Sequence, residues 1–217
     1  MVDPYKVREA MLRDFGVVIP SELPRYNVAP SQLVPIIRSD DSGGLAAENM
    51  RWGLIPFWDK SEKPKIAPIN ARSEDAFSKP MFRQSLQQRR ALFPCDGFFE
   101  WQAHEVGPKT PFYIRMSSAA PFVIAGIYEA ATTVRPEATC ALLTTAPNEL
   151  MEPIHRRMPV ILGPETARRW VRPGAMTQDE MAAFCRPFPA MEMVARRIST
   201  LVNNVRNDGP EVLGEID

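Results

Sequence analysis

Two side chains suited to proton transfer stand out in this sequence. Glu100 lies among large apolar residues in Gly97-Phe98-Phe99-Glu100-Trp101, and His155 lies between two prolines. A carboxylate in such a strand either faces outward or is buried with a raised pKa that suits proton transfer, and histidine titrates near neutral pH. Because a lone histidine is usually structural, a catalytic pairing is a hypothesis at this point. The second histidine, His104, is expected to be an exposed bystander.

A second group of residues suits contact with nucleic acid. Trp52, Phe57 and Trp58 lie close together in the sequence, beside Arg51 and Lys60. Aromatic rings interleaved with cations can stack on unpaired bases and hold phosphates. Taken alone, the pattern fits core aromatic residues next to solvated charges somewhat better. Trp58 stands in a predicted loop, however, where a core role explains a tryptophan less well.

Two further stretches combine polar and apolar residues in a way that is typical of sites. Asn70 follows an apolar residue and precedes a predicted helix start, so its amide could simply cap a turn. Arg72 would share a face with Asn70 if the segment is extended. The stretch Arg25-Tyr26-Asn27-Val28-Ala29-Pro30 is more simply interpreted as an extended edge that proline holds in place.

The elements that must position these side chains are short. A helix is predicted to begin after Asp3, with Pro4 at its first position, and to end at Gly16. Later helices are predicted around residues 82–89 and 164–170, and after a capping box formed by Thr177 and Glu180. Strands are predicted over residues 33–38, 49–55, 91–94, 98–101, 112–116, 122–128 and 139–145, with weaker signals at 160–162 and 193–196.

The abundance of proline fits this pattern of short elements. The chain has 22 prolines in 217 residues, which disfavours long helices and favours short strands joined by fixed turns. We therefore predict an α+β fold, with a curved, mostly antiparallel sheet that forms a barrel-like core surrounded by peripheral helices. The length and the lack of a linker indicate a single domain over residues 1–217.

Composition narrows the class of protein. The charge is balanced, with Lys+Arg 26 against Asp+Glu 26, so a nucleic-acid site would depend on local clusters of arginine. Three widely spaced cysteines form neither a disulfide framework nor a zinc motif, and we expect no metal and no cofactor. With no apolar run long enough for a membrane span and no signal peptide, the protein is expected to be cytoplasmic and monomeric, without a membrane partner.

Six short motifs follow one another along roughly residues 23–210. They are Arg25-Tyr26-Asn27-Val28-Ala29-Pro30, Arg51-Trp52-Gly53-Leu54-Ile55-Pro56, Ile69-Asn70-Ala71-Arg72-Ser73-Glu74, Cys95-Asp96-Gly97-Phe98-Phe99-Glu100-Trp101, Ile154-His155-Arg156-Arg157-Met158-Pro159 and Val202-Asn203-Asn204-Val205. Together and in this order, they resemble the motifs of the SRAP family (SOS response-associated peptidase).

The resemblance implies an enzyme of the DNA damage (SOS) response that binds single-stranded DNA in a basic groove and reacts with abasic sites, as a hydrolase or lyase located with the nucleoid. In the family, the amine of an N-terminal cysteine condenses with the aldehyde of the ring-opened sugar, and the thiol closes a thiazolidine. By the same resemblance, Asn70 would hold the N-terminus or the lesion by hydrogen bonds. Glu100 would shuttle protons, and His155 would act as a general acid–base.

The resemblance also assigns the contacts to DNA. Phe57 and Trp58 match an aromatic wedge that separates bases at the lesion, and Trp52 is grouped with them as a DNA-binding residue. Arg72 and Arg157 match arginines that contact phosphates. Such contacts position a strand without reading its sequence, so binding is expected to depend on salt and to be largely neutral to sequence.

The N-terminus departs from the family pattern. Family members begin Met-Cys-Gly-Arg and continue into a short strand, whereas this chain begins Met1-Val2-Asp3-Pro4. Either the native start lies upstream at a Met-Cys, which is the interpretation we favour because Asn70, Glu100 and His155 are all retained, or the chain has kept the groove and lost the covalent step. The alternatives are therefore a non-catalytic single-stranded DNA binder and a thiol (auto)peptidase, the latter with Cys95 as the remaining nucleophile.

Overall fold

Two sheets carry the fold in the computed structural model, which describes residues 3–20, 24–61 and 64–215. The larger sheet contains β1 (Leu33–Ser39), β2 (Leu45–Trp52), β3 (Asn70–Arg72), β4 (Arg90–Cys95), β7 (Phe122–Glu129), β8 (Thr139–Thr145), β9 (Met158–Pro159) and β10 (Ile161–Leu162). The smaller sheet contains β5 (Phe98–Gln102), β6 (Thr110–Met116) and β11 (Met193–Arg197). Met1 and Val2, where the sequence departs from the family pattern, lie outside the described residues.

The larger sheet closes on itself. Its strand order is β10-β7-β4-β1-β2-β8-β3, and an additional pairing between β7 and β8 completes a ring of hydrogen-bonded strands. All pairings in this sheet are antiparallel except those of β8 with β2 and with β3. The predicted α+β class and curved, mostly antiparallel sheet are thus confirmed, although the ring is not a true barrel because β3, β9 and β10 lie outside it.

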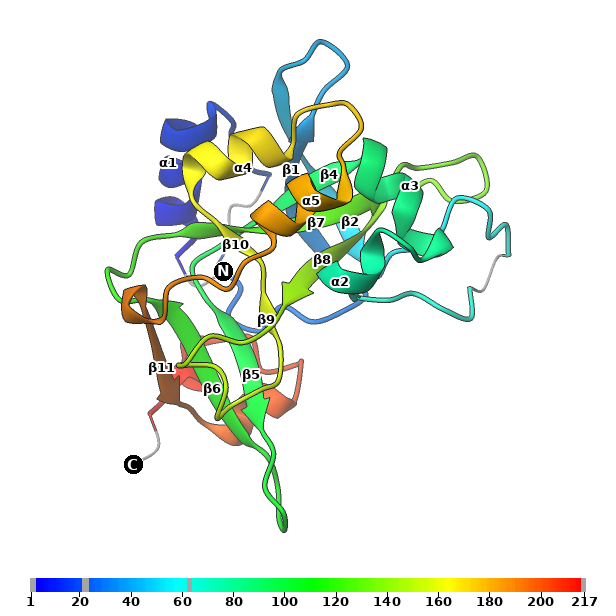
Figure 1. Cartoon of the computed structure of the whole chain (residues 1–217). Coiled ribbons are helices and arrows are strands. Elements are labelled where there is room, and N and C mark those ends of the chain that lie inside the picture. The colour runs from blue at the N-terminus through cyan, green and yellow to red at the C-terminus, as the bar shows by residue number, and fades with distance from the viewer. Residues whose placement is uncertain (1–2, 21–23, 62–63, 216–217) are drawn as a thin grey trace.

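Helices cover one side of the ring, and the smaller sheet projects from the opposite side (Figure 1). The helices are α1 (Pro4–Phe15), α2 (Ser73–Ala76), α3 (Pro80–Gln88), α4 (Pro164–Trp170) and α5 (Gln178–Phe184). Three 3-10 turns, η1 (Ala190–Glu192), η2 (Thr200–Asn203) and η3 (Pro210–Leu213), flank β11.

The local signals for helix ends are confirmed. The Asp3 side chain accepts a hydrogen bond from the Lys6 amide at 3.0 Å, and Gly16 ends α1 with a φ of 72°. A glycine suits that left-handed cap because it has no Cβ to clash. The capping box between Thr177 and Glu180 begins α5 as predicted, with hydrogen bonds in both directions.

One strand prediction needed correction. Residues 160–162 were expected to form one strand, but Val160 lies between two short ones because its backbone changes partner, donating to Leu143 O and accepting from Ala125 N. At Asn70–Arg72, where a turn and an extended segment were both left open, the structure has the extended strand β3. Its partner is β8, in the register Asn70 to Leu142, and a parallel partner so distant in sequence leaves no local pattern.

Strand β8 connects the parts of the molecule. It pairs with β2, β3, β7 and β9, and its side chains alternate between two cores. Ala141 and Leu143 pack in the cluster beneath the helices, whereas Cys140 and Leu142 pack with residues of the smaller sheet. Because β3 and β9 flank β8, this strand sets the relative position of the segments that precede and follow it.

Candidate functional site

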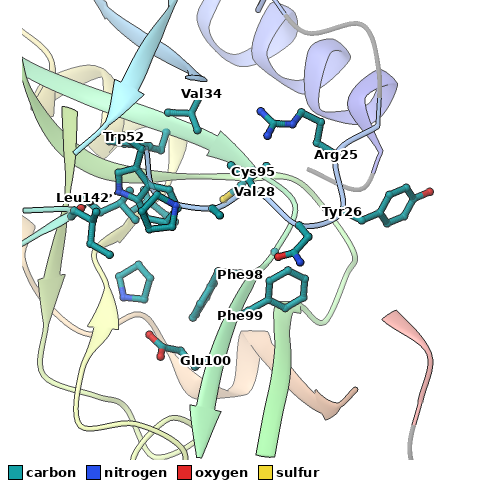
Figure 2. A pocket seen from close by; sticks show the side chains of 18 of the residues that line it. Arg25, Tyr26, Val28, Val34, Trp52, Cys95, Phe98, Phe99, Glu100 and Leu142 are labelled. Carbon is teal, nitrogen blue, oxygen red and sulfur yellow. Dashed lines mark hydrogen bonds between the residues drawn. The ribbon is translucent and has the colours of Figure 1, made fainter. Parts of the chain in front are cut away.

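A cavity of about 990 Å³ lies where the two sheets meet. Figure 2 shows Trp52 and Leu142, from the larger sheet, across the cavity from Phe98 and Glu100 on β5. Asn70 also lines the cavity, so the structure brings three of the predicted site residues to one hollow. Within the motif of Glu100, a Cβ on Gly97 would lie 2.2 Å from the Tyr113 ring, so only glycine allows β5 to approach β6 this closely.

Glu100, which lines the cavity, faces His155, which is not among the lining residues. His155 Nδ1 lies 3.6 Å from Glu100 Oε2, and the side chains are 43% and 23% exposed, respectively. Burial raises the pKa of the Glu100 carboxyl, while the nearby His155 opposes that rise. A partly buried carboxyl of raised pKa beside an imidazole is an arrangement found in general acid–base sites.

The alternation of β5 explains why Glu100 points toward the cavity. Phe98 and Glu100 project from the same side of the strand, and Phe99 projects from the other side (Figure 2). Phe98 packs against the core of the larger sheet, whereas Phe99 and Trp101 pack in a separate cluster with Tyr113. Both faces of β5 are therefore apolar, and the Glu100 carboxylate lies on the face that adjoins the cavity.

His155 lies in a loop that is fixed on both sides. Gln102 Nε2 donates to Pro153 O at 2.8 Å, and the His155 amide donates to Met151 O at 2.8 Å. On the other side, His155 Nδ1 lies 3.0 Å from Arg157 O. The imidazole is thus held by the main chain of its own loop and is not simply mobile at the surface.

Asn70 is placed by its neighbour in the chain. Trp52 Nε1 donates to Ile69 O at 2.9 Å, and the Leu142 amide donates to the same oxygen at 3.0 Å. These two bonds fix the strand immediately before Asn70, whose side chain is exposed at the cavity. Trp52 therefore packs as a partly buried support, in agreement with the simpler interpretation of that aromatic residue, and it also lines the cavity.

Arg157 makes a tight ion pair with Glu74. Its Nη1 and Nη2 atoms lie 2.8 and 2.7 Å from the two carboxylate oxygens, and Nη2 also donates to Thr144 O at 2.5 Å. The Arg157 guanidinium lowers the pKa of the Glu74 carboxyl. The expectation that Arg157 contacts phosphate stays a prediction, and its charge is shared with this carboxylate.

The residues predicted to contact DNA outside the cavity lie at the surface. Phe57 and Trp58 are 45% and 54% exposed in the loop after β2, and Arg72 is exposed on β3. Trp58 lines a second, smaller hollow of about 390 Å³ together with Lys60 and other residues. Because these aromatic rings are exposed on a loop, a role in the core does not explain them, and they suit stacking against bases.

The three cysteines are poor nucleophiles. Burial raises the pKa of the Cys95 and Cys140 thiols far above the ordinary range and raises the pKa of Cys185 to about 12. Since the thiolate is the reactive form, Cys95 does not have the environment of a hydrolase nucleophile. The observation weighs against the thiol peptidase alternative for the described part of the chain.

Sequence reasoning missed two residues that shape the site. Glu74 was quoted only as the end of a motif, although its carboxylate binds Arg157. Asn27 is buried and donates through Nδ2 to Val202 O, Asn204 O and Asn207 O. Motif membership was the only signal for either residue, because both partners lie far along the chain.

Neither a metal site nor a membrane segment emerges from the described ranges. Among residues 3–20, 24–61 and 64–215, no three His, Cys, Asp or Glu side chains gather as metal ligands. In the same ranges, no helix combines the length and the apolarity that crossing a bilayer requires.

Comparison with known proteins agrees with the motifs. The chain is 42% identical over 192 residues to the abasic site processing protein YoqW of Bacillus subtilis, covering 88% of this chain and 85% of that one. It is 34% identical over 198 residues to the abasic site processing protein YedK of Escherichia coli, covering 89% and 86%. A crystal structure of a protein from Bacteroides thetaiotaomicron superposes with a TM-score of 0.76 at 33% identity, covering 86% and 82%. The family model described as SOS response associated peptidase (SRAP) matches residues 4–205, so the chain belongs to the SRAP family.

Proposed function

We propose that this protein binds single-stranded DNA and processes abasic sites, with Asn70, Glu100 and His155 as its reactive centre. The observation that carries the proposal is the contact between Glu100 and His155 at 3.6 Å, beside a cavity that Asn70 also lines. Support comes from the relatives, which are named abasic site processing proteins. The proposal also has it act as a monomer on damaged chromosomal DNA in the cytoplasm, as expected from the sequence.

The chemistry follows from the aldehyde of a ring-opened abasic sugar. If the native start lies upstream, the amine of an N-terminal cysteine attacks the C1′ carbon to give a carbinolamine, which loses water to form an imine. The thiol of the same cysteine then adds to the imine carbon, and the nitrogen takes up the proton, closing a thiazolidine without oxidation or reduction. Glu100 would carry protons to and from the amine and the leaving water, while His155 would protonate the ring oxygen of the sugar during opening.

The DNA would enter along the surface residues. Phe57 and Trp58 supply rings on which bases at the lesion could stack, and Arg72 supplies a cation for phosphate. The first described residue adjoins the cavity, since the Asp3 amide donates to Asp96 Oδ2 at 2.6 Å and Asp96 lines the cavity wall. A reactive amine attached before Asp3 would therefore have a short path to the lesion.

The test is covalent capture of a single-stranded oligonucleotide with one abasic site, followed by a denaturing gel. Two proteins are compared. The first is the chain that begins at Met1, and in the second Met-Cys-Gly-Arg and a strand precede Asp3. The second protein is expected to give a heat-stable shifted band. Glu100→Gln should abolish this band, and His155→Gln should slow its formation. His104→Gln is the matched control, because the side chain of this exposed histidine contacts Thr110 within its own hairpin, and the variant should leave the band unchanged.

The same gels distinguish the remaining candidates. Binding on a native gel with no covalent band from either protein would overturn the covalent step and leave a non-catalytic single-stranded DNA binder. A covalent band from the chain that begins at Met1 would show that this chain itself supplies the nucleophile. Release of peptides from a protein substrate, sensitive to Cys95→Ser, would favour the thiol peptidase instead.

A further inference from the structure

Glu74 and Arg157 form an ion pair, called the clamp below, that bridges three strands of the larger sheet. Glu74 lies in α2, directly after β3, and Arg157 lies directly before β9. Strands β3 and β9 both pair with β8, at Thr144 in each case, from opposite edges. The bidentate ion pair therefore spans β8 and ties the segment after Asn70 to the segment after His155.

The clamp lies close to the imidazole of His155. Arg157 O lies 3.0 Å from His155 Nδ1, and the Arg157 amide lies 3.3 Å from the same nitrogen. Any shift of Arg157 would move this oxygen and hence the ring. On the preceding side the loop is held at Pro153 by Gln102, so His155 is located between two anchors, of which Glu74 supplies one.

The guanidinium also depends strongly on Glu74. Arg157 Nε is buried without a hydrogen-bond partner among the described residues, and only 23% of the side chain is exposed. Glu74 is 53% exposed, so solvent weakens the pair, but the Arg157 side chain is less accessible to water, and without Glu74 only its bonds to Thr144 would remain among the described residues. Removing the Glu74 charge should therefore drive Arg157 toward water and pull its loop out of position.

From this geometry we propose that Glu74 is a positioning residue for the reaction: by clamping Arg157, it holds His155 against Glu100 and in register with Asn70. The proposal rests on the proposed function for its chemical meaning, but the clamp itself is a property of the free protein. It assigns to Arg157 a structural role in the site that differs from contact with phosphate.

The variant that tests this is Glu74→Gln, which is nearly isosteric and removes the charge. Asp75→Asn is a matched control, since Asp75 is the next residue, pairs with Lys79 at 2.8 Å and does not hydrogen-bond Arg157. Each variant removes one negative charge from the same short helix. Glu74→Asp keeps the charge on a shorter side chain and should retain part of the effect of the clamp.

Two readouts are measured on the full chain. Amide hydrogen exchange across residues 153–157 should become faster in Glu74→Gln than in Asp75→Asn, with Glu74→Asp intermediate. The second readout is the rate of product formation in the abasic-site assay at saturating protein. The substitution is made in whichever of the two proteins forms the covalent product. Glu74→Gln should lower this rate about 10- to 100-fold, because a small displacement of a catalytic group is costly. The Kd for single-stranded DNA should stay within about twofold of that of Asp75→Asn.

The outcomes are distinguishable. Unchanged exchange at residues 153–157 in Glu74→Gln would overturn the positioning role, whatever the protein does to DNA. Tighter DNA binding by Glu74→Gln than by Asp75→Asn, with an unaltered rate, would also overturn it and would show that Glu74 merely restrains a phosphate-binding arginine. Failure of every protein to form a covalent product would count against the proposed function, while the exchange measurement would still decide the clamp.

Discussion

At the scale of single residues, Glu100 is an ionisable group placed where its charge is unfavourable. Its pKa is raised by burial, so the folded state holds the proton more tightly than the unfolded state does. The stability that this provides is fully present below the unfolded pKa and is lost as the pH rises through the folded pKa. Ionisation of Glu100 at high pH therefore costs stability.

We expect Glu100→Gln to raise the melting temperature at pH 8 and the gain to shrink toward pH 4, while abasic-site processing is lost. Thermal unfolding followed by circular dichroism at both pH values checks this. Glu105→Gln, at an exposed position in the nearby hairpin, should show no such pH-dependent gain. A Glu100→Gln variant that is less stable than the parent at pH 8 would mean that the charge is compensated in the fold. Such an exchange of stability for activity is common where a site needs a strained or poorly solvated group.

Arg90 is a second buried charge, but its role is structural. It is 5% exposed and donates to the carbonyls of Leu86, Gln87, Trp170 and Gly174 at 2.6 to 3.1 Å. Arg90→Ala should cost about 3 kcal/mol in the free energy of unfolding, because several buried acceptors lose their donor at once. Urea denaturation measures the cost. The exposed Arg83→Ala, on α3, should stay within about 0.5 kcal/mol of the parent.

At the scale of elements, the segment Arg25–Pro30 is tied to residues 202–208, far along the chain. Asn27 Nδ2 bonds three carbonyls of residues 202–207, and its amide donates to Asp208 Oδ1 at 2.6 Å. Asn27→Ala should destabilise the protein by about 1–2 kcal/mol and speed proteolysis within residues 200–208, since that segment loses its main tether. Asn49→Ala, exposed on β2, is the matched control. Cleavage that begins elsewhere would contradict the tether.

Sequence reasoning succeeded for elements whose cause is local. The cap at Asp3, the stop at Gly16 and the capping box at Thr177 each depend on neighbouring residues, and Thr139–Thr145 was predicted with its observed bounds. It left β3 undecided between a turn and an extended segment, because β3 depends on its pairing with the distant β8. Within the candidate site, Glu100 and His155 were singled out from their sequence surroundings and stay predictions as catalytic residues. The ion pair of Glu74 with a residue 83 positions away left no trace in either neighbourhood.

At the scale of the whole molecule, the net charge is zero, so the proposed DNA binding would depend on a few cations. Affinity for single-stranded DNA should fall linearly on a log–log plot against salt, with a slope of about −0.7 for each phosphate contact. Arg72→Gln should reduce the slope by about one such step, whereas Trp58→Ala should cost about 1–3 kcal/mol of binding without changing the slope. Fluorescence anisotropy at several salt concentrations measures both. An equal loss of slope in Arg8→Gln, on α1, would indicate diffuse attraction.

The position of β8 in the chain has a consequence for synthesis on the ribosome. Because β2, β3, β7 and β9 all pair with residues 139–145, the ring is incomplete until this strand has left the exit tunnel. Asn70 and Glu100 are translated well before the strand that aligns them. A nascent chain halted before Thr139 would expose the edges of β2 and β7 and would be a natural client for chaperones, so slow codons beyond residue 145 would favour productive folding more than pauses placed earlier.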